Sequence, residues 1–446
     1  LRMEVTQIKT AAFWVDRFVG DALAKAGQKP NPPSDDFVFL RRIYLDAVGR
    51  IPTDDEASSF LKDRDSEKRR KLIDELLLSD GYRSHLFNWL ADLLRHKNSL
   101  KRTNYSLYER WLKDQIAKNR PWDELVYDLL SAEGSIASSG PTGYLLRDPG
   151  MPLDNLSNTL NIFLGANVAC AQCHDHPLAE WTQREFYELA AFFGATDVSD
   201  RDPRKVGNKL KTNEISKQDV IKAVAPNMAR VHTMGSQTLK FPHDYAYDDV
   251  EPGSPVEPLL FVWESGDEKG PAYDVNLKNP KTLRASFAQW LTHEKNPRFA
   301  ATIANRLWAR LFGLGVKEPL DDLDDLSDSS NPVLLELLGR VMVKADFDLR
   351  EFQRVLFNSK TYQARSSVSP PIGELDDYLF PGPLLRRMTA EQAWDSILAL
   401  VVGEKVDLYK IDRSHRVARY DFPYDKMSPE NVSKVVLAMK KSGHLD

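Results

Sequence analysis

The sequence predicts a mainly α-helical protein, in which two helical domains flank a middle segment with a small β-rich element. Two observations support this fold class. Apolar residues recur at helical spacing through the first and last thirds of the 446-residue chain. Between them, residues 201–280 are rich in charged residues and proline and contain only short alternating runs, which is typical of a linker with a few strands. We therefore expect helical domains at 1–200 and 281–446, joined by 201–280.

The predicted helices of the first domain show apolar stripes and, in places, end signals. Over 37–48, the apolar residues from Phe37 to Ala47 recur at roughly helical spacing. Thr53 followed by Glu56 has the composition of a capping box, so we expect a helix to begin there. Further helices of this domain are expected over 8–26, 68–78, 84–95, 105–117, 153–164 and 184–193.

The middle segment contains two alternating runs, 238–241 and 259–263, which predict short strands. Asn305 and Arg306 lie on one predicted helix of the second domain, and an acidic run follows at 321–325. We expect a network of arginine and carboxylate groups to join the domains there. Helices of the second domain are expected over 282–292, 299–311, 333–343, 349–357 and 390–401.

Composition restricts the classes of partner and of enzyme. The chain carries 60 basic and 65 acidic residues, a formal charge of −5. This charge would not draw the protein onto nucleic acid or an anionic membrane, so we expect no nucleic-acid partner. No stretch reaches the roughly eighteen apolar residues of a membrane-spanning helix, and no export signal is visible. The sequence contains no G-x-S-x-G, P-loop or H-E-x-x-H motif from which to argue a hydrolase, nucleotidase or metalloprotease.

Both cysteines of the chain lie in one C-x-x-C-H segment, formed by Cys170, Cys173 and His174. Two cysteines at this spacing can each form a thioether with one of the two vinyl groups of haem, and the adjacent histidine then ligates the iron. The motif uses both cysteines, so none is left for a long-range disulfide framework. The sequence therefore predicts one covalent haem c with His174 as the proximal ligand, and two helical domains around this site.

Two other chemistries use the same residues. A structural zinc ion could bind Cys170, Cys173 and either His174 or His176, but tetrahedral coordination needs a fourth ligand from a distant segment. A redox disulfide between the cysteines would be expected where a helix follows a strand, whereas the flanking sequence predicts helices. We keep zinc as the less favoured alternative to haem.

The residues around the motif decide what a haem could do. A second strong iron ligand gives an electron carrier, whereas an open position lets a small molecule bind. His176 lies too close to His174 to reach the opposite face, so we expect it to form hydrogen bonds beside the haem or within the fold. The candidates for a distal ligand are His232, Met234 and His243 in the middle segment, and Met151 upstream. The aromatic residues that could line a haem pocket, or belong to the ordinary core, are Trp181, Phe186, Tyr187, Phe192 and Phe193.

Several of these motifs, in this order, resemble a planctomycete cytochrome c-associated family with DUF1549 (PSCyt2) and DUF1553 (PSD1) domains. The resemblance covers about 36–400. It implies export, haem association and bacteria rich in secreted carbohydrate-degrading enzymes, but the family has no established activity. The stretches that resemble the first domain are 39–46, 49–52, 89–95, 163–165, 170–177, 181–183 and 186–193, and those that resemble the second are 285–292, 296–300, 305–308, 312–315, 321–322, 359–363 and 386–392.

We therefore expect an extracytoplasmic c-type haem protein, periplasmic or extracellular, that acts in redox chemistry. It would transfer electrons to or from a redox partner protein, or use haem to oxidise a small molecule or carbohydrate. The alternative, from a different class, is a non-catalytic binding or scaffold protein. In that case the C-x-x-C-H segment would hold haem or zinc only to fix the fold.

Overall fold

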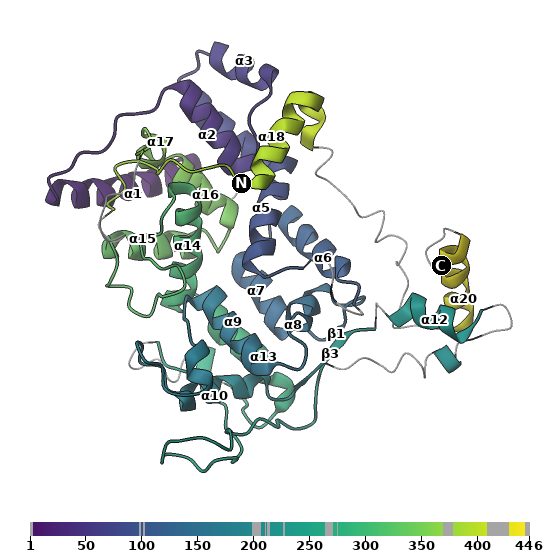
Figure 1. The fold of residues 1–446 in the computed structure, drawn as a ribbon. Coiled ribbons are helices and arrows are strands. Elements are labelled where there is room, and N and C mark those ends of the chain that lie inside the picture. The colour runs from purple at the N-terminus through teal and green to yellow at the C-terminus, as the bar shows by residue number, and fades with distance from the viewer. Residues whose placement is uncertain are drawn as a thin grey trace.

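The computed structural model describes residues 3–97, 100, 103–198, 207–209, 211, 215–225, 228–263, 271–273, 275–368, 378–407 and 428–441. These residues are mainly helical, as the sequence predicts (Figure 1). The helices of the N-terminal part are α1 (Val5–Lys25), α2 (Asp36–Val48), α3 (Asp54–Lys62), α4 (Lys68–Leu78), α5 (Asp80–Leu93), α6 (Ser106–Ala117), α7 (Trp122–Ser131), α8 (Gly143–Leu146), α9 (Pro152–Leu164) and α10 (Gln183–Ala190), with 3-10 turns η1 (Gly140–Thr142), η2 (Ala169–Gln172) and η3 (Ala191–Phe193).

The C-terminal part is again helical, and a shorter helix lies in the middle segment. Most helices begin at a side chain that accepts a hydrogen bond from the first turn, and the capping box expected at Thr53 is present, with reciprocal bonds to Glu56. The remaining elements are α12 (Lys217–Val224), η5 (Pro271–Tyr273), α13 (Pro280–Thr292), α14 (Pro297–Phe312), α15 (Pro332–Lys344), α16 (Leu349–Phe357), α17 (Lys360–Gln363), α18 (Ala390–Val402), η7 (Gly403–Lys405) and α20 (Pro429–Lys441).

The described strands form one small antiparallel sheet in the order β1, β3, β2. β1 (Gly134–Ser135) and β2 (Thr196–Asp197) flank β3 (Arg230–Thr233), which is the one strand contributed by the middle segment. The prediction of a strand at 259–263 is wrong, and at 238–241 it is confirmed only as an isolated antiparallel bridge between Lys240 and Pro255. Their apolar side chains are used differently: Phe241 is buried and its ring contacts Tyr187, while the Phe261 ring contacts Trp181.

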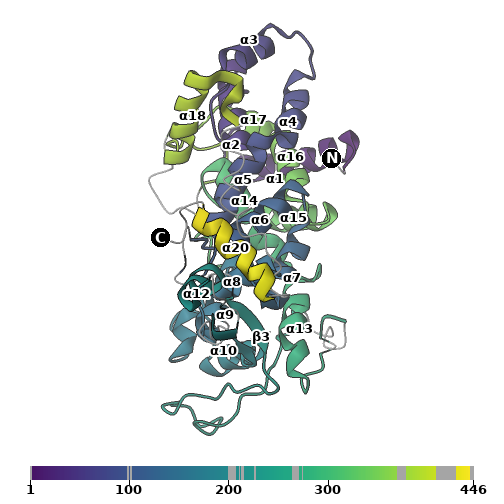
Figure 2. The ribbon, with the colours of Figure 1, turned by 90° about the vertical axis from the view of Figure 1, so that its right-hand side faces the viewer.

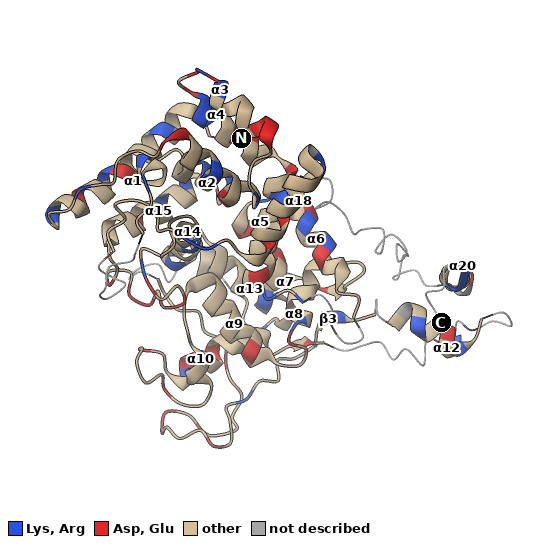
Figure 3. Cartoon of the chain, turned by 45° about the horizontal axis from the view of Figure 1, so that its top comes forward, with Lys and Arg blue, Asp and Glu red and all other residues tan. Residues whose placement is uncertain are grey.

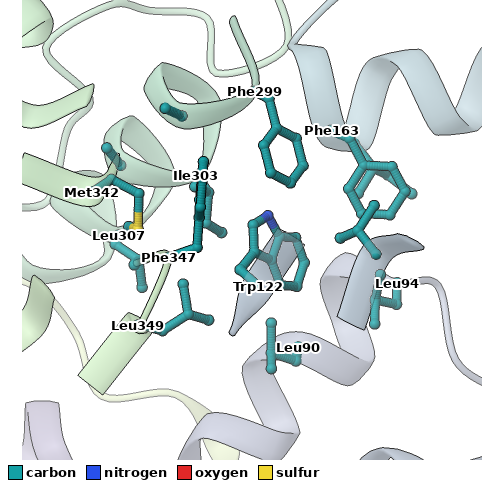
Figure 4. Close-up of a cluster of buried hydrophobic side chains, with 14 of the residues drawn as sticks. Leu90, Leu94, Trp122, Phe163, Phe299, Ile303, Leu307, Met342, Phe347 and Leu349 are labelled. Carbon is teal, nitrogen blue, oxygen red and sulfur yellow. The ribbon is translucent and has the colours of Figure 1, made fainter. Parts of the chain in front are cut away.

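One hydrophobic core runs through both halves of the chain. Trp122, at the start of α7, is fully buried, and its backbone N–H donates to the carbonyl of Phe347 at 2.9 Å. Its ring contacts Phe163 of α9, with ring centroids 5.7 Å apart. Figure 4 shows side chains of α14, Phe299 among them, on the other side of the indole. The two helical regions therefore share a continuous interior.

A second, smaller apolar cluster joins α12 to α20, which are distant in sequence. Val220 of α12 packs with Val432 and Val436 of α20, and Lys440 forms an ion pair with Asp219 at 2.8 Å. Figure 1 shows this helix pair standing to one side of the main body. The middle segment and the C-terminal part of the chain thus meet in space.

The main body is elongated, with α3 and α10 toward opposite ends in both Figure 1 and Figure 2. Basic and acidic residues are interspersed over the outer helices on the face shown in Figure 3, in keeping with the small net charge. Among the described helices, none has the length and apolar character needed to cross a membrane.

Candidate haem attachment site

The C-x-x-C-H segment lies between α9 and α10, and its entry is fixed by contact with the C-terminal half. α9 ends at Gly165, which has the left-handed φ of 59°. The Gly165 carbonyl accepts a hydrogen bond from the backbone N–H of Leu323 at 2.7 Å. A Cβ at position 165 would lie only 2.6 Å from Leu323 Cδ1, so both the backbone conformation and the close approach require glycine.

The motif begins in the 3-10 turn η2, and backbone hydrogen bonds join its three reactive residues in one short turn. The backbone N–H groups of Cys173 and His174 both donate to the carbonyl of Cys170, at 3.1 and 3.2 Å. Residues three and four positions apart on such a turn are neighbours. All three residues are exposed, and the two thiols are not bridged to each other. This arrangement suits two thioether bonds to one porphyrin with an imidazole beside them.

The ring of His174 is held in one tautomer. Its Nδ1 lies 2.7 Å from the backbone carbonyl oxygen of Asp175. Since a carbonyl can only accept, Nδ1 carries the proton and Nε2 carries the free lone pair. A metal-ligating histidine needs this arrangement, in which the second ring nitrogen donates to a carbonyl and fixes the ring. In the neutral ring, Nε2 is then the nitrogen with an available lone pair.

His176 has a different role in this structure. Its Nδ1 accepts hydrogen bonds from the backbone N–H groups of Leu178 at 3.2 Å and Ala179 at 2.9 Å. Its own backbone N–H donates to the carbonyl of Trp181 at 2.7 Å. These bonds close the turn after the motif, so His176 supports the loop through the fold, one of the two roles expected for it.

Two residues that sequence analysis did not single out fix the loop around Asp175. The Asp175 backbone N–H donates to the Tyr247 hydroxyl, and the Asp175 carboxylate accepts from the backbone N–H of Gln183, both at 2.8 Å. The Gln183 side chain donates to the Gln172 carbonyl at 3.2 Å. No local pattern marks Tyr247 as part of this site, because it lies 72 residues away along the chain.

Of the aromatic residues expected near the motif, Tyr187 lies beside it. Burial raises the pKa of Tyr187, and its neighbours Cys173 and Asp244 raise this pKa further. The Tyr187 ring contacts Phe241 with centroids 5.8 Å apart, and Phe241 contacts Tyr245 at 5.2 Å. An aromatic wall built from α10 and the segment 241–247 therefore adjoins the motif.

The other aromatic candidates serve the core or the domain contact. Phe192 and Phe193 both contact Phe287 of α13, and Phe186 is completely buried. Trp181 is half-buried and donates from its indole to the carboxylate of Asp324 in the C-terminal half.

The candidates for a distal ligand have different surroundings in the structure. His232 lies on β3 with its Nε2 3.2 Å from the Asp197 carboxylate of the adjacent strand. Met234 follows β3, and its backbone N–H donates to Ala195. His243 is exposed and belongs to the segment that carries Phe241 and Tyr245. Met151 is the N-cap of α9, a helix-length of about 20 Å from the end that leads to the motif.

The expected arginine–carboxylate network is present near the motif, but with a different arginine. Arg298 forms an ion pair with Asp324 at 2.7 Å. Arg306 instead donates to the backbone carbonyl of Asn161 on α9 at 3.0 Å. Both contacts help to hold the C-terminal half against the region that carries the motif.

The described part of the chain contains no group of three or more His, Cys, Asp or Glu side chains placed to hold a metal ion. A four-coordinate zinc ion at Cys170 and Cys173 would therefore need further ligands to move in. A porphyrin needs from the chain only the two thiols and the imidazole, and these belong to exposed residues of one short backbone turn.

Comparison with known families finds two matches, one in each half of the chain. Residues 14–198 match the family PSCyt2, described as a protein of unknown function (DUF1549), and residues 283–431 match PSD1, described as a protein of unknown function (DUF1553). The chain therefore contains a PSCyt2 domain followed by a PSD1 domain. No curated protein and no solved structure matches it. The haem motif lies in the PSCyt2 domain, Asp324 and Arg298 lie in the PSD1 domain, and the wall segment 241–247 lies between the two domains.

Proposed function

We propose that this protein is an extracytoplasmic c-type haem protein that acts in redox chemistry. The observation that carries the proposal is the hydrogen-bonded turn that holds the exposed residues Cys170, Cys173 and His174, with His174 Nδ1 donating to the Asp175 carbonyl. Exposed thiols can be reached by the vinyl groups of haem, and the fixed tautomer presents a lone pair for iron.

Bound haem would supply one-electron chemistry, and the chain's own residues would position it and control access. The hydrogen bonds of Asp175 to Tyr247 and Gln183 hold the turn that carries the imidazole. Tyr187, Phe241 and Tyr245 offer an apolar surface beside Cys173, and apolar cover limits solvent at a redox centre. Of the distal candidates, His243 shares this segment, whereas His232 is engaged by Asp197.

The proposed location is the periplasm or the outside of the cell, where c-type haem is attached. The partner would be a redox protein, or a small molecule or carbohydrate that is oxidised. The exposed position of the motif supports electron exchange with a partner, because an edge of the porphyrin would face solvent.

The proposal is tested by producing the chain with an export signal in a host that has a c-type haem attachment system. We expect an absorption spectrum with a Soret band that survives acid–acetone extraction, and loss of covalent haem in the double variant Cys170→Ala, Cys173→Ala. A matched preparation retained in the cytoplasm should carry no covalent haem. Extractable haem, bound zinc or a Cys170–Cys173 disulfide in the exported protein would overturn the proposal, and would favour a non-catalytic scaffold.

The same spectrum separates the two redox roles. A high-spin spectrum that responds to cyanide or peroxide indicates an open iron position and a substrate-oxidising enzyme. A six-coordinate spectrum that ignores both ligands indicates electron transfer.

A further inference from the structure

A second site lies far from the haem motif, between the PSCyt2 and PSD1 domains. A cavity of about 770 Å³, open to solvent on one side, is lined by α2, α5, the C-terminal part of α14 and the segment 383–392. In Figures 1 and 2, α2 lies toward the end of the molecule opposite α10, and α5 lies between α2 and the middle of the molecule. The volume is that of a site for a small organic molecule, and domain interfaces are common places for such sites.

The floor of the cavity contains a buried cation with an unused donor. Arg310 Nη1 is inaccessible to solvent and has no hydrogen-bond partner within the described structure. Its Nη2 donates to the His85 carbonyl at a long 3.4 Å, and the guanidinium lies 5.1 Å from the ring centre of Trp89. Leaving a buried donor unsatisfied costs about 1–3 kcal/mol, and more for a charged group, so this arrangement favours an acceptor from outside the chain.

Within the described structure, no neighbouring carboxylate accepts a hydrogen bond from Arg310 Nη1. Asp46, the nearest buried carboxylate in the cavity wall, accepts from the Tyr362 hydroxyl and from Arg386, both at 2.8 Å. The lining contains five arginines and three carboxylates, so positive charge exceeds negative charge by two. Burial lowers the pKa of Arg310 to about 10, which still leaves it charged at neutral pH. The unmet requirement of the cavity is therefore an anion.

The other residues that line the cavity indicate which chemical groups the ligand carries besides its anion. Trp89, Leu384 and Met388 provide apolar surface, which suits a carbon skeleton rather than a bare inorganic ion. Asp92 and Glu391 also line the cavity, and their carboxylates accept hydrogen bonds from hydroxyl groups. We propose that this cavity binds a small hydroxylated carboxylic acid, with its carboxylate on Arg310 and its hydroxyl groups toward Asp92 and Glu391. The site is distinct from the haem motif and does not depend on it.

The test is calorimetric titration of the full chain with D-glucuronate, D-glucose and inorganic sulfate as probes. We expect saturable glucuronate binding with a Kd of about 1 mM or below, and glucose and sulfate each at least about tenfold weaker. The variant Cys170→Ala, Cys173→Ala should bind glucuronate as the parent does, which separates this site from the fate of the haem proposal. Equal binding of glucuronate and glucose, binding of sulfate alone, or no binding of any probe would overturn the inference.

Single substitutions test whether glucuronate binds in this cavity. Arg310→Gln should weaken glucuronate binding at least about tenfold. Because Arg310 also packs on Trp89, a second variant guards against a folding defect: Arg387→Gln, on the exposed rim, should weaken binding about two- to threefold through charge alone. The control is Arg340→Gln on α15, an exposed arginine paired only with Glu336 of its own helix within the described structure, which should bind normally. Unchanged binding in folded Arg310→Gln protein would contradict the assignment.

Discussion

The indole nitrogen of Trp181 donates to both carboxylate oxygens of Asp324, at 3.2 and 3.1 Å. Arg298 binds the same carboxylate at 2.7 Å and donates to the Asp324 carbonyl at 3.0 Å. The Trp181 carbonyl in turn accepts from His176, which closes the turn after the haem motif. Asp324 of the PSD1 domain is therefore coupled to the motif of the PSCyt2 domain through two hydrogen-bonded steps.

Replacing Asp324 by alanine should lower the free energy of unfolding by about 1–3 kcal/mol, since it leaves a half-buried indole N–H and a guanidinium without their acceptor. Urea denaturation monitored by far-UV circular dichroism measures this change. The control is Asp325→Ala, whose exposed carboxylate accepts from Ser327 and makes no contact with the motif. An equal effect of both variants would show that Asp324 does not join the domains.

A second prediction concerns the glycine at the entry to the motif. Gly165→Ala should destabilise the protein by the cost of a left-handed alanine, about 1–2 kcal/mol, plus a further 1–3 kcal/mol for the clash with Leu323. Gly150→Ala is the matched control, because Gly150 has a φ of 74° but open space around its Cβ position. The difference between the two denaturation curves isolates the contact with Leu323. Equal losses of stability in the two variants would mean that the loop around Leu323 moves to accommodate the added methyl group at little cost.

The parts of the fold that could be predicted are the helices, because the spacing of apolar residues and the capping residues are local features of the sequence. The bounds of α4 agree with the predicted 68–78, and the capping signal at Thr53 marks the start of α3. The alternating run 259–263 predicted a strand that does not form, because its apolar residues make aromatic contacts instead. Trp263, for example, stacks on Trp290 with ring centroids 5.8 Å apart. Local sequence does not distinguish these two uses of alternating apolar residues.

In the candidate site, too, residues in a local sequence motif could be proposed from the sequence, whereas contacts from distant segments could not. The sequence could propose Cys170, Cys173 and His174 as a site because thioether attachment would fix their spacing along the chain, and this assignment stays a prediction. Tyr247 could not be predicted, since it reaches the loop from a distant segment through tertiary packing. Asp324 lies in the acidic run that was expected to pair with arginine, but its contact with Trp181 was not predicted.

The two histidines of the motif loop should respond differently to alanine substitution. If haem is attached as proposed, His174→Ala removes its proposed axial nitrogen, so the haem spectrum should shift while both thioethers remain. His176→Ala should leave the spectrum in place but reduce stability by about 1–2 kcal/mol, because two backbone N–H groups lose their acceptor. Absorption spectra and denaturation of the exported proteins measure both effects. A spectral change in His176→Ala with an unchanged spectrum in His174→Ala would reverse the assigned roles.

The distal position allows a similar comparison. If the spectrum is six-coordinate, His243→Ala should convert it to a cyanide-responsive form, because His243 lies in the wall segment beside Tyr187. His232→Ala should leave the spectrum unchanged, since that ring is engaged by Asp197 within the sheet. The opposite pattern would require the sheet to rearrange around the motif.

The last prediction concerns pH and the start of α7. Burial raises the pKa of Asp123 from 3.8 to about 6, and its Oδ1 is buried without a hydrogen-bond partner in the described structure. Between these two pH values the folded protein holds a proton that the unfolded chain has released. The free energy of unfolding should therefore contain a contribution that is complete below pH 3.8 and is lost as the pH rises through about 6.

Asp123→Asn removes this titration while keeping the shape of the side chain. At pH 7 the variant should be more stable than the parent by about 1–2 kcal/mol, a value reduced for partial solvent screening, and its stability should vary less between pH 4 and 6. Asp55→Asn is the matched control, because Asp55 occupies the same position in the first turn of α3 but is exposed. There the loss of a favourable interaction with the helix dipole should lower stability slightly, so the two variants are expected to differ in sign at pH 7. Denaturation curves across this pH range measure both variants, and a loss of stability in Asp123→Asn at pH 7 would show that the charged carboxylate is favoured where it lies.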